Sequence, residues 1–155
     1  MNKKHSLPFC KAIVNEAPMS TAGKSILIVD LDTDTSSMLS SVLSQQGYYV
    51  TSTSSGQEAL NHLQLLPDLI ILDPQLSDMN GLDLLRTIKQ QTELSSIPVF
   101  MLSNKETETD EIISLEVGAD DYITKPLQVP RLKARIRALF RRQDQQLTTQ
   151  DRERE

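Results

Sequence analysis

The chain has 155 residues, of which 38% are hydrophobic and 24% charged. This is enough for one compact domain with short tails. Its net charge of −5 argues against a nucleic-acid-binding surface, which needs a concentration of basic side chains. Cys10 is the single cysteine, so an intrachain disulfide is excluded. No apolar run approaches the roughly 20 residues of a membrane helix, and no signal peptide is recognisable. We therefore expect a cytoplasmic protein with no membrane partner.

Residues 1–24 have no hydrophobic periodicity and are predicted to form a disordered leader. After them, short apolar runs alternate with segments of helical spacing. Continuous apolar runs of four to six residues are typical of strands that are covered on both faces. The runs predict five strands, at residues 26–29, 48–53, 69–72, 99–102 and 122–124.

The segments between these runs carry apolar residues at the spacing of an amphipathic helix. Their stripes lie at residues 38–43, 59–63, 82–88, 112–117 and 132–140. Pro67 ends the second helix, Asn80 and Gly81 open the third, Gly118 closes the fourth, and Pro130 lies near the start of the last. This alternation predicts an α/β domain over residues 25–142, with a parallel sheet covered on both faces. Residues 143–155 have no apolar face and are predicted to be a linker or tail.

Polar residues follow four of the predicted strands. Ligands of open α/β sheets bind beyond the carboxyl ends of the strands, so these side chains are expected to converge. A carboxylate there can accept a phosphoryl group, and a second carboxylate can help to hold a divalent cation. A lysine can pair with a phosphoryl oxygen. The residues concerned are Asp30 and Asp32 after the first strand, Asp73 after the third, Ser103 at the end of the fourth and Lys125 after the fifth.

Residues 24–142 resemble the response-regulator receiver family. The resemblance rests on the stretches 26–30, 67–73, 79–85, 97–103 and 118–126, which read ILIVD, PDLIILD, MNGLDLL, IPVFMLS and GADDYITKP. It implies a (βα)5 doubly wound parallel sheet of the flavodoxin or CheY-like type, with strand order 2-1-3-4-5. It also implies a signalling domain rather than an enzyme, which receives a phosphoryl group from a sensor histidine kinase.

The resemblance assigns roles to individual positions. Asp73 matches the phosphoacceptor, and Lys125 matches the lysine of the site. Ser103 matches the hydroxyl that responds to the new phosphoryl group, and Tyr122 matches the aromatic residue that moves inward with it. The cofactor implied is Mg²⁺, held by Asp30, Asp73 and the backbone carbonyl of Gln75.

One departure from the family concerns the metal. The family has two adjacent carboxylates after the first strand, but here Leu31 follows Asp30. Asp32 is a further candidate ligand, although strand neighbours point to opposite faces. Because Mg²⁺ retains several waters and is bound by few protein ligands, the loss of one ligand predicts weakened or absent metal binding. Ser77 and Asn80 replace a proline and an aspartate of the family in the loop after Asp73.

The last helix resembles that of OmpR/PhoB-type regulators. This implies control of transcription, with DNA contacted only through a C-terminal domain outside this sequence. It also implies a homodimer through the fourth helix, fifth strand and fifth helix. The residues expected in that interface are Asp120, Asp121 and Arg135, with Glu111 and Arg131 as a pair whose charges are reversed relative to the family.

Two other functions fit parts of the sequence. Leu31 favours a pseudo-receiver, which binds proteins without being phosphorylated. The stretch from Asp30 to Thr33 also matches the D-x-D part of the D-x-D-x-T signature of haloacid-dehalogenase-type phosphotransferases, with Asp30 as nucleophile. That family needs an acidic pair after the lysine, whereas Asp120 and Asp121 precede Lys125 here.

Overall fold

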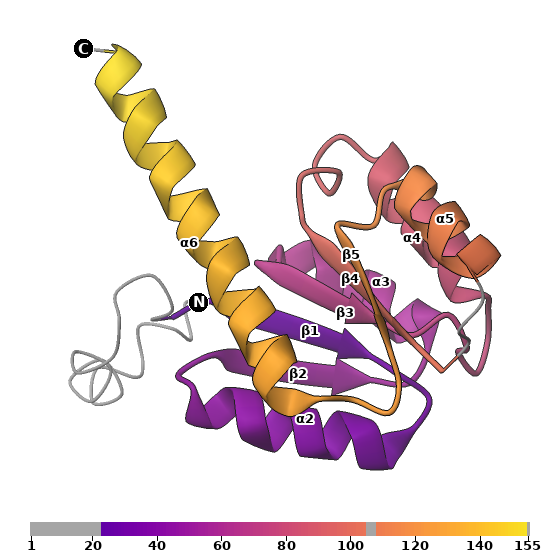
Figure 1. The fold of residues 1–155 in the computed structure, drawn as a ribbon. Helices are drawn as coiled ribbons and strands as arrows, with labels where there is room; N and C mark the ends of the chain where they lie inside the picture. Colours follow the sequence, from indigo (N-terminus) through magenta and orange to yellow (C-terminus); the bar gives the residue numbers. More distant parts are fainter. Residues whose placement is uncertain (1–22, 105–107, 155) are drawn as a thin grey trace.

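The computed structural model describes residues 23–104 and 108–154 as strands and helices in regular alternation (Figure 1). The predicted leader falls almost wholly outside these residues. None of the described helices is long and apolar enough to cross a bilayer. The elements in chain order are β1 (Ser25–Val29), α2 (Thr33–Gln45), β2 (Tyr49–Thr53), α3 (Gly56–His62), the 3₁₀ turn η3 (Leu63–Leu65), β3 (Leu69–Leu72), α4 (Gly81–Gln90), β4 (Val99–Ser103), α5 (Glu108–Val117), β5 (Asp121–Thr124) and α6 (Val129–Arg154).

The five strands form one parallel sheet with the order β2-β1-β3-β4-β5, which confirms the predicted architecture. The order reverses between β1 and β3, the two strands of the centre. In register, Val29 pairs with Thr53 on one side and with Leu72 on the other. The residues that follow β1 and β3 therefore leave the sheet side by side, at the switch point where open α/β sheets bind their ligands.

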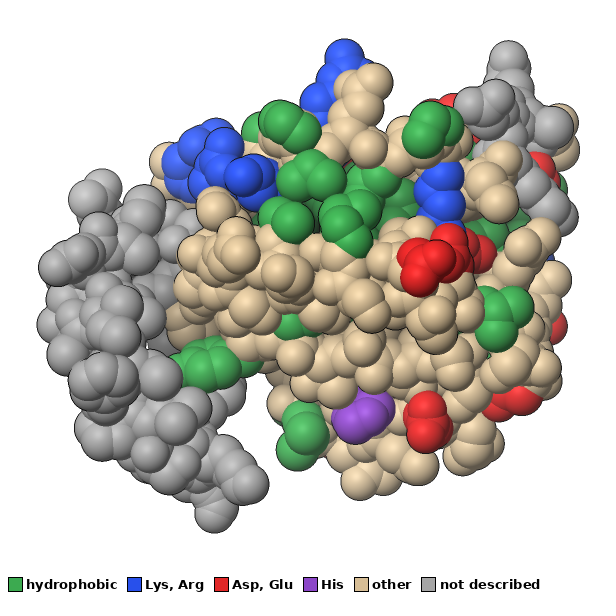
Figure 2. Space-filling view, turned by 90° about the horizontal axis from the view of Figure 1, so that it is seen from below, with side chains coloured by type: hydrophobic (Ala, Val, Ile, Leu, Met, Phe, Trp, Pro, Cys, Tyr) green, Lys and Arg blue, Asp and Glu red, His purple; other side chains and the backbone are tan. Residues whose placement is uncertain are grey.

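Two hydrophobic layers cover the sheet because strand side chains alternate between its faces. On one face, Ile26 and Ile28 of β1 pack with apolar residues of α2 and α6. On the other face, Leu27 and Val29 pack with α3, α4 and the end of α5. Figure 2 views the molecule from the α2 side, where much of the surface is neutral, because the outward positions of α2 are mostly Ser, Thr and Gln.

The helix boundaries follow local chemistry. Asn80 caps α4, since its side chain accepts a hydrogen bond from the backbone N–H of Leu82 at 2.8 Å. Gly118 follows α5 with φ of +134°, a conformation that favours glycine. The second predicted helix ends earlier than Pro67, because η3 replaces its last turn and Leu66 takes a left-handed conformation. Pro130 is the second residue of α6, as predicted.

Helix α6 continues beyond residue 142, where the compact domain was predicted to end. Its packed residues lie between Leu132 and Phe140, and the helix then projects away from the sheet to Arg154 (Figure 1). The final segment therefore has helical backbone. Its role as a linker or tail remains a prediction.

Gly81 provides a test of the packing beside Asp73. A Cβ at this position would lie 2.5 Å from the backbone oxygen of Asp73 and 2.6 Å from the Cα of Pro74. Gly→Ala inside a helix is usually stabilising. Here we expect Gly81→Ala to destabilise the fold by about 1–3 kcal/mol, because backbone cannot move aside as a side chain can.

The measurement is urea unfolding, with Gln90→Ala at the exposed last residue of α4 as the control. Gln90→Ala should leave the unfolding midpoint nearly unchanged. Equal stability of Gly81→Ala and the parent would contradict the packing described.

Candidate functional site

Two buried carboxylates and one lysine meet at the carboxyl edge of the sheet. The Nζ of Lys125 lies 2.7 Å from Oδ2 of Asp73 and 3.1 Å from Oδ2 of Asp30. Asp30 is 3% exposed and Asp73 is 4% exposed. Buried charges of this kind are stable only when they are paired and hydrogen-bonded. The ammonium group therefore holds together side chains that follow three different strands.

The backbone aligns these side chains. The N–H of Asp73 donates to the carbonyl of Val29 at 2.9 Å, and the N–H of Asp30 donates to that of Thr53 at 3.0 Å. The N–H of Lys125 donates to the carbonyl of Ser103 at 2.8 Å. Each bond extends the pairing of parallel strands by one residue past a strand end. The convergence of side chains expected from the sequence is thus observed for Asp30, Asp73 and Lys125, and Ser103 is joined to them through its backbone carbonyl.

The second carboxylate oxygens are also bound. Oδ1 of Asp73 accepts the N–H of Gln75 at 2.7 Å, and Oδ1 of Asp30 accepts the N–H of Asp32 at 2.9 Å. Both bonds connect residues two positions apart, as in an Asx turn. They turn the chain sharply at the ends of β1 and β3.

The pKa values of Asp30 and Lys125 are both raised. This favours the neutral form of Asp30 and the charged form of Lys125. Burial raises the pKa of Asp30, and the neighbouring charge of Asp73 adds to this, while hydrogen bonds from Asp32 and Lys125 act to lower it. Burial acts to lower the pKa of Lys125, but its bonds to Asp73 and Asp30 outweigh this and raise it. The lysine is therefore held in its charged form.

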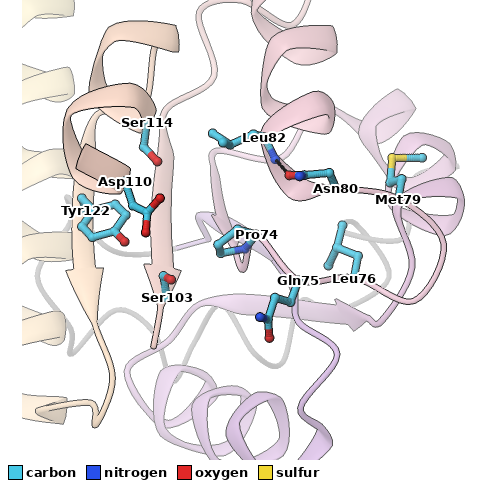
Figure 3. Close-up of a pocket in the computed structure, with 10 residues that line it drawn as sticks. All are labelled: Pro74, Gln75, Leu76, Met79, Asn80, Leu82, Ser103, Asp110, Ser114 and Tyr122. Carbon is cyan, nitrogen blue, oxygen red and sulfur yellow. Dashed lines mark hydrogen bonds between the residues drawn. The ribbon is translucent and has the colours of Figure 1, made fainter. Parts of the chain in front are cut away.

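Ser103 and Tyr122 line a cavity of about 240 Å³ beside the site (Figure 3). Ser103 is 1% exposed and Tyr122 is 9% exposed. The opposite wall is the loop between β3 and α4, with Pro74 and Gln75. Figure 3 shows Asp110 and Ser114 on α5 pointing toward the same space. The sequence reasoning missed these two residues, because a polar residue on an amphipathic helix gives no sign of which side chain faces a cavity.

The oxygen donors at this edge fit a hard cation such as Mg²⁺, which prefers carboxylates and carbonyls. Asp30 and Asp73 supply two carboxylates, and Gln75, whose carbonyl is the third candidate, lies two residues after Asp73 and donates its N–H to that carboxylate. No group of three or more His, Cys, Asp or Glu suited to a metal occurs among residues 23–104 and 108–154. Leu31 is 48% exposed at the rim of the site.

Asp32 has a structural role. Its side chain accepts the N–H groups of Asp34 and Thr35 and the hydroxyl of Thr35 at 3.1, 3.4 and 2.8 Å. It is thus the N-cap of α2, and these bonds lower its pKa, with the Thr35 hydroxyl as the main cause. Asp34 lies in the first turn of α2 and is not its cap. A metal-binding role for Asp32 remains a prediction.

The residues expected in a dimer interface lie on α5, β5 and α6, except Asp120, which lies just before β5. Asp121 pairs with Arg135 within the same chain. Asp120 accepts the N–H of Val99 at 2.9 Å and lies 3.7 Å from the Nζ of Lys89, so it also stabilises the start of β4.

The other two predicted interface residues, Glu111 on α5 and Arg131 on α6, are exposed. Beside Glu111, Ile112 is 45% exposed. Leu115, one turn further along α5, is 41% exposed.

Comparison with known proteins identifies the class. The sequence profile described as response regulator receiver domain matches residues 26–137. The chain therefore belongs to the response regulator receiver domain family, and it is a receiver domain of a two-component response regulator. This match favours neither the pseudo-receiver nor the phosphotransferase alternative.

Curated relatives are transcriptional regulators. SphR of Synechococcus elongatus, an alkaline phosphatase synthesis transcriptional regulatory protein, is 39% identical over 139 residues, or 83% of this chain and 53% of SphR. The DNA-binding response regulator MtrA of Mycobacterium tuberculosis is 40% identical over 127 residues, or 81% of this chain and 54% of MtrA. These relatives are of the OmpR/PhoB type that the last helix resembles. The chain spans about half the length of the curated relatives it matches.

Solved receiver structures share the fold. The BeF3-activated N-terminal receiver domain of RstA from Klebsiella pneumoniae has a TM-score of 0.71 at 28% identity, covering 76% of this chain and 99% of that one. The Mn²⁺-bound form of response regulator Rcp1 has a TM-score of 0.64 at 28% identity, covering 75% of this chain and 91% of that one.

The pKa of Asp30 provides a test of the site's electrostatics. In Lys125→Met, the hydrogen bond and the positive charge that lower this pKa are lost, whereas burial and the charge of Asp73 remain. We expect the pKa of Asp30 to rise further, as measured by carboxyl-carbon NMR titration without divalent cations. Lys133→Met on α6 is the control, and its Asp30 should titrate as in the parent.

The raised pKa of Asp30 also makes the stability of the fold depend on pH. Because the pKa of Asp30 is raised on folding, the unfolded chain loses this proton first as pH rises. Ionisation of Asp30 therefore decreases stability between the unfolded pKa of 3.8 and the higher folded pKa. Lys125→Met should extend this window upward. An unchanged or lowered pKa of Asp30 in this variant would show that Lys125 does not lower the pKa of this carboxyl group.

Proposed function

We propose that this receiver domain accepts a phosphoryl group at Asp73 from a sensor histidine kinase. The observation that carries the proposal is Lys125, whose Nζ lies 2.7 Å from the Asp73 carboxylate at the switch point of the sheet. A carboxylate oxygen of Asp73 would attack the phosphorus of the kinase's phosphohistidine. The oxygen–phosphorus bond forms, the nitrogen–phosphorus bond breaks, and the imidazole nitrogen keeps the electron pair.

The surrounding side chains suit the product. Lys125 would exchange part of its contact with Asp73 for a phosphoryl oxygen, as a charge-assisted bond. The hydroxyl of Ser103, at the end of the neighbouring strand, would hydrogen-bond the phosphoryl group, and Tyr122 would follow it inward. Since Tyr122 is already largely buried in this structure, the response would be a shift in populations between two states.

Metal would assist by neutralising charge on the phosphoryl oxygens. We assign its protein ligands as Asp30, Asp73 and the carbonyl of Gln75. Rcp1, which shares the fold, has a solved Mn²⁺-bound form. We infer that Leu31, in the place of a second carboxylate, weakens binding of Mg²⁺ here. The exposed position of Leu31 leaves space in which a carboxylate at this position could reach the metal.

Restoring the missing carboxylate tests this assignment. Leu31→Asp adds a hard oxygen ligand and should tighten Mg²⁺ binding by about tenfold, in the range seen when groups around a metal are changed. Affinity can be measured by Mg²⁺ titration of amide NMR shifts. Labelling with acetyl phosphate should saturate at lower Mg²⁺ than in the parent.

Two controls separate the possible results. Leu31→Asn has the same size without the charge and should change the affinity less. Asp73→Asn should remove labelling in either background, because the acceptor oxygen is lost. If the parent were never labelled at millimolar Mg²⁺, acceptance of phosphate by the natural sequence would be refuted.

We further infer that output requires a homodimer through α5, β5 and α6, and that it controls transcription through a DNA-binding domain. The exposed apolar residues Ile112 and Leu115 support this surface. The transcriptional relatives support the output. The Asp121–Arg135 pair, formed here within one chain, would exchange partners between subunits. The cytoplasm remains the predicted compartment.

The reversed pair Glu111 and Arg131 makes the dimer testable. Glu111→Arg should place like charges opposite each other at two symmetric sites and weaken dimerisation of the BeF3-treated protein by about three- to tenfold. Sedimentation measures this. Glu116→Arg, also exposed on α5, has the same charge change and should have a smaller effect. The double variant Glu111→Arg with Arg131→Glu should dimerise like the parent, and failure to do so would exclude this pairing.

A further inference from the structure

The loop between β3 and α4 is fastened to the start of α3 by one side chain. Oδ1 of Asp78 accepts the backbone N–H of Gly56 at 2.7 Å, and Oδ2 accepts that of Gln57 at 3.0 Å. These two bonds lower the pKa of Asp78, the Gly56 bond most strongly. Helix α3 has its own cap in Ser55, whose side chain accepts the N–H of Glu58. Asp78 thus satisfies two of the N–H groups that the first turn leaves without a helical partner.

Two further contacts strengthen this connection. Ser77 donates from its N–H and its hydroxyl to the carbonyl of Ser54, at 3.4 and 3.3 Å. Ser77 stands where the family has proline, and a proline could make neither bond. Next to it, the side chain of Met79 fills the space that a Cβ at Gly56 would need. The tip of the loop is therefore held by hydrogen bonds and by packing.

The base of the same loop is closed beside the phosphoryl-acceptor site. Gln75 and Asn80 form an isolated antiparallel bridge, and the N–H of Gly81 donates to the carbonyl of Pro74 at 2.8 Å. The N–H of Gln75 donates to Asp73 at 2.7 Å. Gln75 is thus the residue through which the loop contacts the acceptor carboxylate. The tip and the base share only the few residues between Gln75 and Asp78, so movement at the tip would be transmitted to Gln75.

We propose that Asp78 is a positioning residue for the metal and acceptor site, which acts by fixing the loop that presents the carbonyl of Gln75. The inference rests on the proposed function of Asp73. The positioning of Gln75 matters more in this chain because Leu31 supplies no carboxylate. Metal binding then depends more strongly on the remaining ligands being held in place. Groups that orient metal ligands without touching the metal commonly affect affinity.

The test compares Asp78→Ala with Asp68→Ala. Asp68 makes the same kind of long-range bond at the opposite edge of the sheet, accepting the N–H of Ser25 at 2.8 Å. Asp78→Ala should weaken Mg²⁺ binding by about tenfold, measured by titration with Mg²⁺ alone. Asp68→Ala should change the affinity by less than about twofold, even with an equal loss of thermal stability. Asp78→Asn retains one acceptor oxygen and should lie between Asp78→Ala and the parent.

A second readout reports the loop itself without metal. Amide exchange at Gly56, Gln57 and Gln75 should accelerate together in Asp78→Ala, while exchange at Leu27 of the interior strand β1 stays slow. Equal Mg²⁺ affinity in Asp78→Ala and the parent would overturn the proposal. So would an equal loss in Asp68→Ala, since that would indicate general destabilisation. If the parent itself neither bound Mg²⁺ nor became labelled, the proposed function would be refuted. The exchange data would still show whether Asp78 holds the loop between β3 and α4 in place.

Discussion

The ammonium group of Lys125 between Asp30 and Asp73 is the interaction on which the site depends. Two carboxylates that are almost fully buried repel one another and lose their hydration. One cation within hydrogen-bonding distance of both makes their burial stable. Since the three residues follow β1, β3 and β5, the same interaction also ties the centre of the sheet to its far edge. A phosphoryl group entering as proposed would compete for this lysine, so chemistry at Asp73 would be coupled to the packing of β5 and its loop.

Much of the fold followed from the sequence, because buried parallel strands produce continuous apolar runs and their helices produce amphipathic spacing. The convergence of Asp30, Asp73 and Lys125 followed as well, since parallel strands bring their carboxyl ends to one edge. The boundaries were less accurate where backbone conformation decides them. Leu66, for example, takes a left-handed conformation that a leucine in the sequence does not predict.

The features that the sequence did not reveal are contacts between distant loops. The bonds of Asp78 span 21 and 22 residues, and no local pattern distinguishes an aspartate that binds a distant helix from one that is solvated. Asp32 is similar. Its position two residues after Asp30 made it a candidate metal ligand, which remains a prediction, but gave no sign of the helix cap that its bonds to Thr35 and Asp34 form. One side chain can serve either purpose, and only its orientation decides.

The site thus combines a reduced set of carboxylates with a tightly braced loop. Leu31 removes charge near the acceptor, while Ser77 and Asp78 add hydrogen bonds that limit how Gln75 can move. A binding site can gain affinity either from more ligands or from less freedom in the ligands it has. Under the proposed function, the second source would be the more important one in this receiver.

The length of α6 has a mechanical consequence. Beyond Arg142 the helix continues for 12 more residues to Arg154, which at 1.5 Å per residue is about 18 Å. It acts as a lever whose fulcrum is the packed segment around Ile136 and Phe140. From Phe140 to Arg154 the helix rises about 21 Å, so a tilt of about 10° at that point would displace the far end by roughly 4 Å. A rearrangement too small to alter the sheet would therefore produce a larger displacement at the end of α6.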